Sequence, residues 1–208
     1  MAETQVKKKK KRYKVVTPIG RLSYPYLATP DQGREYSDDK YKTDILFPKD
    51  TFKEEGAKLR KACILCARDF FDNQTMTLKS FKHPIKDGDE KDMTKESNKH
   101  YANCYYITAK TDRKPMVLDA RRKEMSAEDI AQLKGGDYAR VVLSIFGYPH
   151  KGGGVSAGLQ VVQFAKEGEA FGGDGRQADL ALLDDLEVEL DSVDDLVDEA
   201  ESLDDLDM

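Results

Sequence analysis

The chain has 208 residues, with 34 basic and 39 acidic side chains, a formal net charge of −5 and a hydrophobic fraction of 39%. This length fits one domain with tails, and the low apolar fraction indicates that part of the chain is not packed into a core. The sequence lacks the apolar run of about 18 residues that a membrane-spanning helix needs. Its three cysteines, an odd number, argue against a disulfide framework and favour a reducing compartment.

The charge is divided unevenly along the sequence. Residues 177–208 hold 14 acidic and no basic side chains, which leaves 25 acidic and 34 basic side chains in residues 1–176, a net of +9. The chain is therefore a basic body followed by an acidic tail, and the body alone has the sign of charge that binds phosphate. A nucleic acid is a plausible partner of the body even though the whole chain is negative.

The first expected element is a disordered basic arm, residues 1–12, because its run of lysines repels itself. Three roles are open for this arm: contact with phosphates, nuclear import, or a solvated end of the chain. Short strands are expected at residues 13–17 and 41–47, where apolar and polar side chains alternate. Three prolines confine the segment between these strands to a sheet edge or an extended loop.

A helical period is present between Phe52 and Phe71, where small and apolar side chains share one face. These side chains are Leu59, Ala62, Cys63, Cys66, Ala67 and Phe70. Residues 72–100 are polar and rich in lysine, so we expect a long loop there. Strand character returns at residues 101–109 and 116–120, and a capped helical turn is expected from Ser126 to Ile130.

Residues 137–173 have the pattern of a β-hairpin, with two alternating segments around a glycine-rich tip. The residues expected to face the core are Ala139, Val141, Leu143, Ile145 and Gly147 on the first strand, and Val155, Ala157, Leu159 and Val161 on the second. The opposite face carries aromatic rings and a cation. Rings stack on bases and cations meet phosphates without a fixed sequence, so this face suits single-stranded nucleic acid. A sandwich hairpin whose outer rings pack under a loop is the open alternative.

The predicted elements fit a mainly β fold, an OB-fold barrel with one long helix inserted between strands and disordered termini. A β-sandwich is the next choice. The candidate nucleic-acid contacts on the hairpin and its tip are Tyr138, Arg140, Phe146, Tyr148, His150 and Lys151. Second-rank candidates elsewhere in the body are Tyr106, Lys82, Arg113 and Lys114.

The sequence shows no enzyme motif. None of its three histidines lies in a metal or nucleophile motif, and Lys151–Gly154 lacks the spacing of a P-loop. A metal site at Cys63 and Cys66 would need two more ligands, for which His100 and Cys104 are the available pair. On the apolar face of a helix, however, cysteine behaves as a small hydrophobic side chain. We therefore expect no enzymatic activity, no catalytic residue, no cofactor and no bound metal.

The acidic tail has an apolar stripe of its own. Leucines and valines recur at spacings of three and four, at Leu183, Leu186, Leu190, Val193 and Val197. This is the pattern of a latent amphipathic helix with acids on its other faces. Because the tail has nothing in its own sequence to cover the stripe, we expect it to be disordered alone and to order on a partner.

Three stretches in this order resemble the single-stranded-DNA-binding proteins of tailed bacteriophages, which have an OB fold and an acidic C-terminal tail. The first runs from Gly20–Pro25 through Tyr41–Pro48, the second is Pro84–Lys91, and the third is the hairpin, above all Gly154–Gln160. The resemblance extends over most of residues 13–173. It implies an OB-fold single-stranded-DNA-binding domain at residues 13–173 and an acidic tail at residues 174–208, and it does not explain the disordered basic arm expected at residues 1–12.

The resemblance also implies a function, namely sequence-independent binding and protection of single-stranded DNA in phage DNA replication, recombination and repair. The acidic tail would compete with DNA and recruit the phage DNA polymerase and helicase/primase. The family implies DNA contact by rings near the hairpin tip, here Tyr148 and His150, possible homodimers and a place in the cytoplasm of the infected bacterial host. Two alternatives are an acidic-tail chaperone of basic proteins, with Lys7–Arg12 as an import signal, and an RNA-binding OB module, because stacking surfaces accept both sugars.

Overall fold

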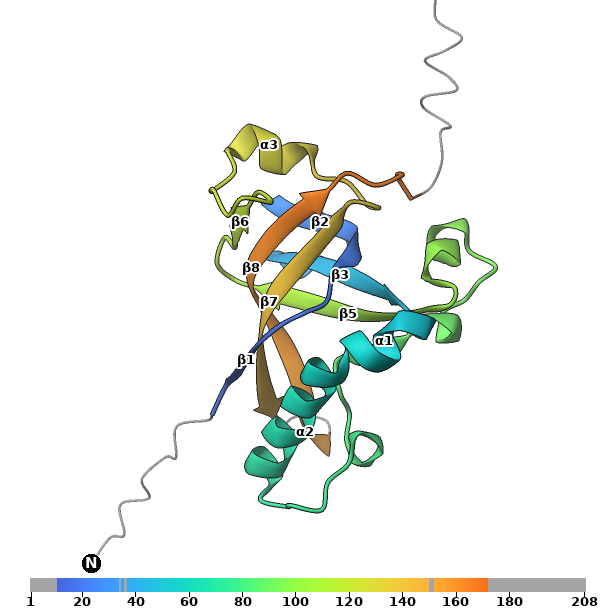
Figure 1. Ribbon diagram of the computed structural model, residues 1–208, viewed down its shortest axis with the longest axis vertical. Helices are drawn as coiled ribbons and strands as arrows, with labels where there is room; N and C mark the ends of the chain where they lie inside the picture. The colour runs from blue at the N-terminus through green and yellow to red at the C-terminus, as the bar shows by residue number, and fades with distance from the viewer. Residues whose placement is uncertain (1–10, 34, 36, 150–151, 172–208) are drawn as a thin grey trace, which may run out of the picture. The chain divides into compact units, whose positions relative to one another are not determined.

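Five long strands dominate the structure, a computed structural model that describes residues 11–33, 35, 37–149 and 152–171 (Figure 1). They are β2 (Gly20–Asp31), β3 (Lys40–Pro48), β5 (Cys104–Thr111), β7 (Tyr138–Tyr148) and β8 (Gly154–Lys166). Three short strands accompany them: β1 (Tyr13–Val16), β4 (Ile85–Asp87) and β6 (Met116–Leu118). The described residues all belong to one unit of the chain, residues 1–172.

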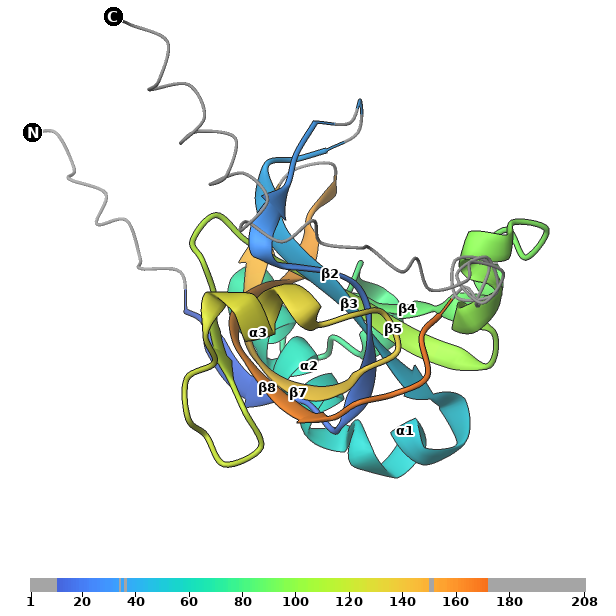
Figure 2. The same ribbon diagram turned by 90° about the horizontal axis from the view of Figure 1, so that it is seen from above.

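The long strands pair in a closed cycle. Antiparallel pairs join β7 to β2, β2 to β3, β3 to β5 and β8 to β7, and a parallel contact between β5 and β8 completes the ring. Figure 2 shows these strands curving around a common interior. A five-stranded Greek-key barrel of this kind is an OB fold. The sequence predicted a mainly β fold, namely a barrel with a helix inserted between its strands, and the structure confirms this prediction.

The barrel interior is filled by the inward faces of these strands. On β7, the alternation predicted the buried residues correctly, since Ala139, Val141, Leu143 and Ile145 are fully buried. On β8 the prediction holds only as far as Leu159. Val142 pairs with Val161 and Leu143 with Leu159, so Gln160 is an extra residue. Such a bulge reverses the faces beyond it, and Val162 is buried instead of the expected Val161.

Two helices, α1 (Lys49–Glu55) and α2 (Ala57–Phe71), follow β3 where the sequence predicts a single helix. Gly56 separates them, with φ of −78° and ψ of 0°, and a side chain there would meet the Phe52 ring at 2.7 Å. The predicted apolar face is confirmed over most of its length. The buried residues of α2 are Leu59, Ala62, Cys63, Cys66 and Ala67.

The long loop expected at residues 72–100 contains short regular elements that the sequence did not predict. This stretch contains β4 and the short 3₁₀ helices η1 (Leu78–Ser80), η2 (Gly88–Glu90) and η3 (Glu96–Tyr101). The segment is ordered by packing on the outside of the barrel, where Tyr101 forms a second apolar cluster with Leu46 and Tyr106.

The small helix α3 (Ala127–Gln132) has the expected cap, with the Ser126 hydroxyl accepting a hydrogen bond of 3.1 Å from the Asp129 amide. No helix among the described residues is long and apolar enough to cross a membrane.

Candidate nucleic-acid interface

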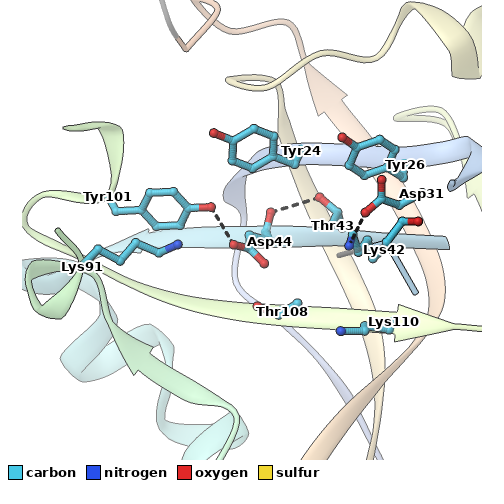
Figure 3. Close-up of a pocket in the computed structure, with 11 residues that line it drawn as sticks. Tyr24, Tyr26, Asp31, Lys42, Thr43, Asp44, Lys91, Tyr101, Thr108 and Lys110 are labelled. Atoms are coloured by element: carbon cyan, nitrogen blue, oxygen red, sulfur yellow. Dashed lines mark hydrogen bonds and ion pairs between the residues drawn. The ribbon is translucent and has the colours of Figure 1, made fainter. Parts of the chain in front are cut away.

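A cleft of about 400 Å³ lies on the outer face of the barrel, over β2, β3 and β5 (Figure 3). The strand register aligns its lining, because Lys42 of β3 is opposite both Tyr26 of β2 and Lys110 of β5. In OB folds, the corresponding face and the loops beside it bind oligonucleotides. The lining residues are Tyr24, Tyr26, Asp31, Ser37, Lys42, Thr43, Asp44, Lys91, Tyr101, Thr108 and Lys110.

Two tyrosines of β2 supply aromatic surface to this cleft. Figure 3 shows Tyr24 and Tyr26 next to each other above β3. Tyr24 is 46% exposed and has a left-handed backbone, with φ of 48°, at a register shift between Ser23 and Tyr26. Its hydroxyl donates a hydrogen bond of 3.2 Å to the Ser97 carbonyl. Backbone outliers of this kind are often retained at binding sites, and here the bulge carries an exposed ring.

The cations of the cleft are held by neighbouring carboxylates. The Lys42 ammonium lies 2.5 Å from Asp31 and 3.4 Å from Asp38, and the Lys110 ammonium lies 2.5 Å from the other oxygen of Asp38. Burial alone would lower the pKa of Lys42, but hydrogen bonding and charge from Asp31 and Asp38 raise it above its usual value. Both ammonium groups are therefore held in place by ion pairs, and Asp38 neutralises part of their charge.

A rigid polar pair forms the floor of the cleft. The Tyr101 hydroxyl donates a hydrogen bond of 2.6 Å to the Asp44 carboxylate, and burial raises the pKa of this phenol. The Lys91 ammonium lies 3.8 Å from the Tyr101 ring centroid and 4.7 Å from that of Tyr106. Burial lowers the pKa of Lys91, although Asp44 acts in the opposite direction. Lys91 is thus a cation held over aromatic faces.

A row of rings continues from the cleft toward the end of the described chain. The His100 ring is 6.1 Å from Tyr24, 4.4 Å from Tyr101 and 4.3 Å from Phe171, all between ring centroids. His100 shares a hydrogen bond of 2.8 Å between its Nε2 and the Ser23 hydroxyl. Burial, with help from the charges of Lys91 and Arg21, lowers the pKa of His100, which favours the neutral imidazole.

The predicted hairpin contacts do not all share this cleft. Tyr138 lies beside two cations, with the Arg21 guanidinium 5.5 Å and the Lys166 ammonium 4.8 Å from its ring centroid. Arg140 is exposed and donates a hydrogen bond of 2.8 Å to Gln163. It lines a different groove, formed by β1, α1 and α2.

Nearer the tip, Phe146 and Tyr148 are half-buried on the outer face of β7. The Arg12 guanidinium, at the end of the basic arm, lies 5.3 Å from the Phe146 ring centroid. Lys82 and Tyr148 come together around Gly154, where a side chain would be 2.7 Å from both the Lys82 carbonyl and the Tyr148 hydroxyl. His150 and Lys151 lie outside the described residues.

The remaining candidates are separated from these. Tyr106 is on the cleft face of β5 but only 8% exposed, because its ring packs edge-on against Tyr101 at 4.9 Å between centroids. Arg113 and Lys114 are exposed in the turn between β5 and β6.

In the described part of the chain, no group of three or more His, Cys, Asp or Glu side chains is placed to hold a metal ion. Burial raises the pKa of Cys63 to about 12 and that of Cys66 to about 11, so these thiols behave as apolar groups.

Sequence reasoning missed Tyr24, Tyr26, Lys42, Lys91 and Lys110 as candidates. A signal was present for Tyr24 and Tyr26, which are two residues apart, whereas the pairing of Lys42 with Lys110 is visible only in the strand register. The prolines around Tyr24 and Tyr26 obscured it, because they favoured a sheet edge or an extended loop. Lys91 had no signal, as it reaches the cleft from a segment without periodicity.

Comparison with known proteins supports a common ancestry for this barrel. A family model described as Enterobacter phage Enc34, ssDNA-binding protein matches residues 13–193. Protein p50 of Acyrthosiphon pisum secondary endosymbiont phage 1 is 30% identical over 175 residues, which are 81% of this chain and 91% of that relative.

Two solved structures of the single-stranded DNA-binding protein from bacteriophage Enc34 have the same fold. The complex with ssDNA has a TM-score of 0.63 at 27% identity and covers 76% of this chain and 89% of that chain. A second structure of the Enc34 protein has a TM-score of 0.62 at 26% identity, over 81% and 89% of the respective chains. The family model extends over most of the sequence, so this chain belongs to the family described as Enterobacter phage Enc34, ssDNA-binding protein.

Proposed function

We propose that this protein binds single-stranded DNA without sequence preference, with bases on the tyrosines of the cleft and phosphates on its lysines. The observation that carries the proposal is the pair Tyr24 and Tyr26 beside Lys42 and Lys110 on the barrel face that OB folds use for oligonucleotides. Each stacked base contributes about 1–3 kcal/mol. Family membership and the ssDNA complex of the Enc34 protein support the same ligand.

Lys110 serves as a phosphate ligand once its internal partner Asp38 is replaced. Lys110 is 46% exposed and Asp38 is 28% exposed, so a phosphate can reach their ion pair. Exposed ion pairs of this kind are weak, on the order of 0–1 kcal/mol. A DNA phosphate can therefore displace Asp38 at little cost, and the freed counterions make binding sensitive to salt.

The hairpin extends the same surface. Lys110 at the end of the cleft pairs with Gly158 of β8, and a side chain at position 158 would lie 3.5 Å from the Phe146 ring. The outward faces of β5 and of the hairpin are thus continuous at Gly158. We propose that DNA continues from the cleft toward the hairpin tip. The candidates along and beside this route remain Tyr138, Arg140, Phe146, Tyr148, His150, Lys151, Tyr106, Lys82, Arg113 and Lys114.

In its biological setting, the protein would coat and protect single strands during phage DNA replication, recombination and repair, in the cytoplasm of the infected bacterial host, and would have no enzymatic role. We assign this activity to residues 13–173, with residues 1–12 as a basic arm and residues 174–208 as the acidic tail. The tail, with 14 acids after residue 176, is a polyanion that would compete with DNA. Its apolar stripe suits contacts with the phage DNA polymerase and helicase/primase, and the chain would act as a homodimer.

The proposal is tested by binding and by mapping the contact. Fluorescence anisotropy of a labelled oligothymidine with the full chain should show binding, with a log-log salt slope of about −0.7 for each phosphate neutralised. Ultraviolet crosslinking to the same oligomer, followed by mass spectrometry, should label the peptide that contains Tyr24 and Tyr26. Labelling confined to the hairpin would contradict the cleft, and tighter binding to a matched oligouridine would favour the RNA module.

A complete absence of binding would refute the proposal itself. In that case the acidic-tail chaperone becomes the better hypothesis, and basic proteins would be the next ligands to test. The full chain is the appropriate sample, since the competing tail belongs to the activity that is proposed.

A further inference from the structure

The Phe171 ring is bound as a nucleobase would be. It stacks on His100 with 4.3 Å between ring centroids and 15° between ring planes. The Arg21 guanidinium lies 4.1 Å from the centroid of the same ring. An aromatic ring and an arginine plane are the two surfaces on which bases of single strands stack.

The groups that hold Phe171 are themselves fixed. The Arg21 Nε donates a hydrogen bond of 3.0 Å to the Gly136 carbonyl, and its terminal nitrogen donates to the Glu169 carbonyl. His100 is fixed by its hydrogen bond of 2.8 Å to the Ser23 hydroxyl and by its contact with Tyr101. Such preorganised surfaces bind a planar ligand without the cost of ordering long side chains.

The ring of Phe171 is held by packing, and its backbone is anchored by a hydrogen bond. Phe171 follows the end of β8 at Lys166, and its backbone amide donates one hydrogen bond of 3.0 Å to the Gly135 carbonyl. The ring packs on the outer cluster of Leu46, Tyr101 and Tyr106 and is half-buried. Rotation of the Phe171 side chain alone would uncover the His100 ring, with the main-chain hydrogen bond still in place.

This position is continuous with the cleft. Tyr101 contributes to the lining of the cleft and also contacts His100, and Tyr24 lies 6.1 Å from His100 between ring centroids. Tyr26, Tyr24 and His100 thus form a series of ring surfaces that ends at Phe171. A strand whose bases stack along this series would reach the place that Phe171 fills.

We propose that Arg21 and His100 form a nucleobase-binding subsite, which Phe171 fills as an internal mimic of a base. The inference rests on the proposed binding of single-stranded DNA and adds one subsite to it. Phe171 lies three residues before Asp174, the first residue of the predicted acidic tail. Entry of a base would therefore release the residue that leads into the tail, which links occupancy of the cleft by DNA to the position of the tail.

The test uses a tryptophan as a reporter. The sequence contains no tryptophan, so a Phe171→Trp variant of the full chain carries a single indole. Titration with oligothymidine should shift its emission to longer wavelength as the indole leaves the subsite, in step with the anisotropy of the labelled oligomer. The matched control is Phe164→Trp, because Phe164 is half-buried on β8 opposite Ala139, outside the subsite. Its emission should not follow binding.

A second variant gives the affinity. Phe171→Ala should bind oligothymidine about threefold to tenfold more tightly, because the subsite no longer has an internal competitor. Adding His100→Ala to Phe171→Ala should remove this gain. Unchanged emission of the Phe171→Trp variant at saturating oligothymidine, or unchanged or weaker binding by Phe171→Ala, would overturn the subsite while single-strand binding stands. If the unaltered chain gives no anisotropy change, the proposed function falls, and the subsite with it.

Discussion

The cleft over β2, β3 and β5 and the hairpin of β7 and β8 differ in how their functional groups are held. In the cleft, each ring or cation has a fixed partner, such as Asp44 for Tyr101 and Asp38 for Lys110. Near the hairpin tip, the rings of Phe146 and Tyr148 lie next to a glycine-rich turn in which Gly152 and Gly153 have positive φ values of 86° and 74°. The first region is a preorganised site, whereas the second depends on a turn that only glycine forms without strain.

This difference has an energetic meaning. A preorganised surface loses little freedom when a ligand binds, so more of its contact energy is available as affinity. At the tip, Gly152 and Gly153 carry no side chains that could contact a ligand, so fewer contacts are available there. We therefore expect the cleft to supply most of the affinity for single strands and the hairpin to extend the contact.

The largest effect should come from the rings of the cleft. The double variant Tyr24→Ala and Tyr26→Ala should weaken binding to oligothymidine by about 30-fold or more, since two stacking contacts are lost at about 1–3 kcal/mol each. Tyr148→Ala removes one contact at the hairpin and should cost about fivefold. Anisotropy titrations measure both. The control is Tyr41→Ala, on the same strand as Lys42 but outside the cleft lining. A greater loss from Tyr148→Ala than from the double variant would reverse the comparison.

The second prediction disturbs the hairpin and leaves the cleft intact. At Gly147 of β7, a side chain would lie 2.2 Å from the Phe70 ring of α2, so Gly147→Ala should destabilise the fold by about 1–3 kcal/mol through overpacking. Gly158→Ala is the matched control, because the added methyl group would lie 3.5 Å from its nearest neighbour, the Phe146 ring, which is an ordinary van der Waals distance. Denaturant unfolding measures the two changes. Equal stability of both variants would contradict the tight packing of α2 on the hairpin.

The two regions also differ in how far the sequence predicted them. Period-two alternation identified the buried residues of β7, because a strand in a barrel wall has one face in the core and one outside. It failed on β8 beyond Leu159, since the bulge at Gln160 depends on pairing with β7 and leaves no mark in the residue types. The fold class was accessible because strand pattern and turn residues agree along most of the body.

The cleft was harder to foresee for a physical reason. Pro25, between the two tyrosines, argued for a sheet edge or an extended loop, yet β2 accommodates it at a register shift where no regular ladder pairing is needed. Two lining residues of the cleft, Lys91 and Tyr101, come from the segment before β5, where Tyr101 packs against Leu46. Contacts between segments far apart in the sequence have no periodic signature, so this part of the site had to be seen in the structure.

A third prediction changes the charge of the cleft. Asp38→Asn should free Lys110, which Asp38 contacts at 2.5 Å, whereas Lys42 keeps its partner Asp31 at 2.5 Å, and binding should tighten about threefold to tenfold. The salt slope should become steeper by about 0.7, as one more phosphate is neutralised. Asp112→Asn is the control, because it removes the same charge from the pair with Lys40 at 3.1 Å, outside the cleft lining. An equal gain from both variants would mean that only net charge matters.

The smallest expected effect is the pH dependence that His100 contributes on the cleft side. Burial lowers the pKa of His100 in the folded protein, the charges of Lys91 and Arg21 lower it further, and Asp44 opposes them. The unfolded chain, with a histidine pKa of about 6.5, therefore binds more protons than the folded one just below that pH. Stability from this group is present above about pH 6.5 and decreases as the pH falls through it.

Thermal melts of the unaltered chain and of His100→Gln between pH 7.5 and 5 isolate this contribution. Burial also lowers the pKa of His83, but His83 is present in both proteins and its contribution cancels in the difference. The melting temperature of the unaltered chain should fall more steeply on acidification than that of the variant. Parallel curves would mean that His100 titrates alike in the folded and unfolded chains, and the imidazole could then not be the desolvated stacking surface beside Tyr101 and Phe171 that distinguishes the cleft from the hairpin.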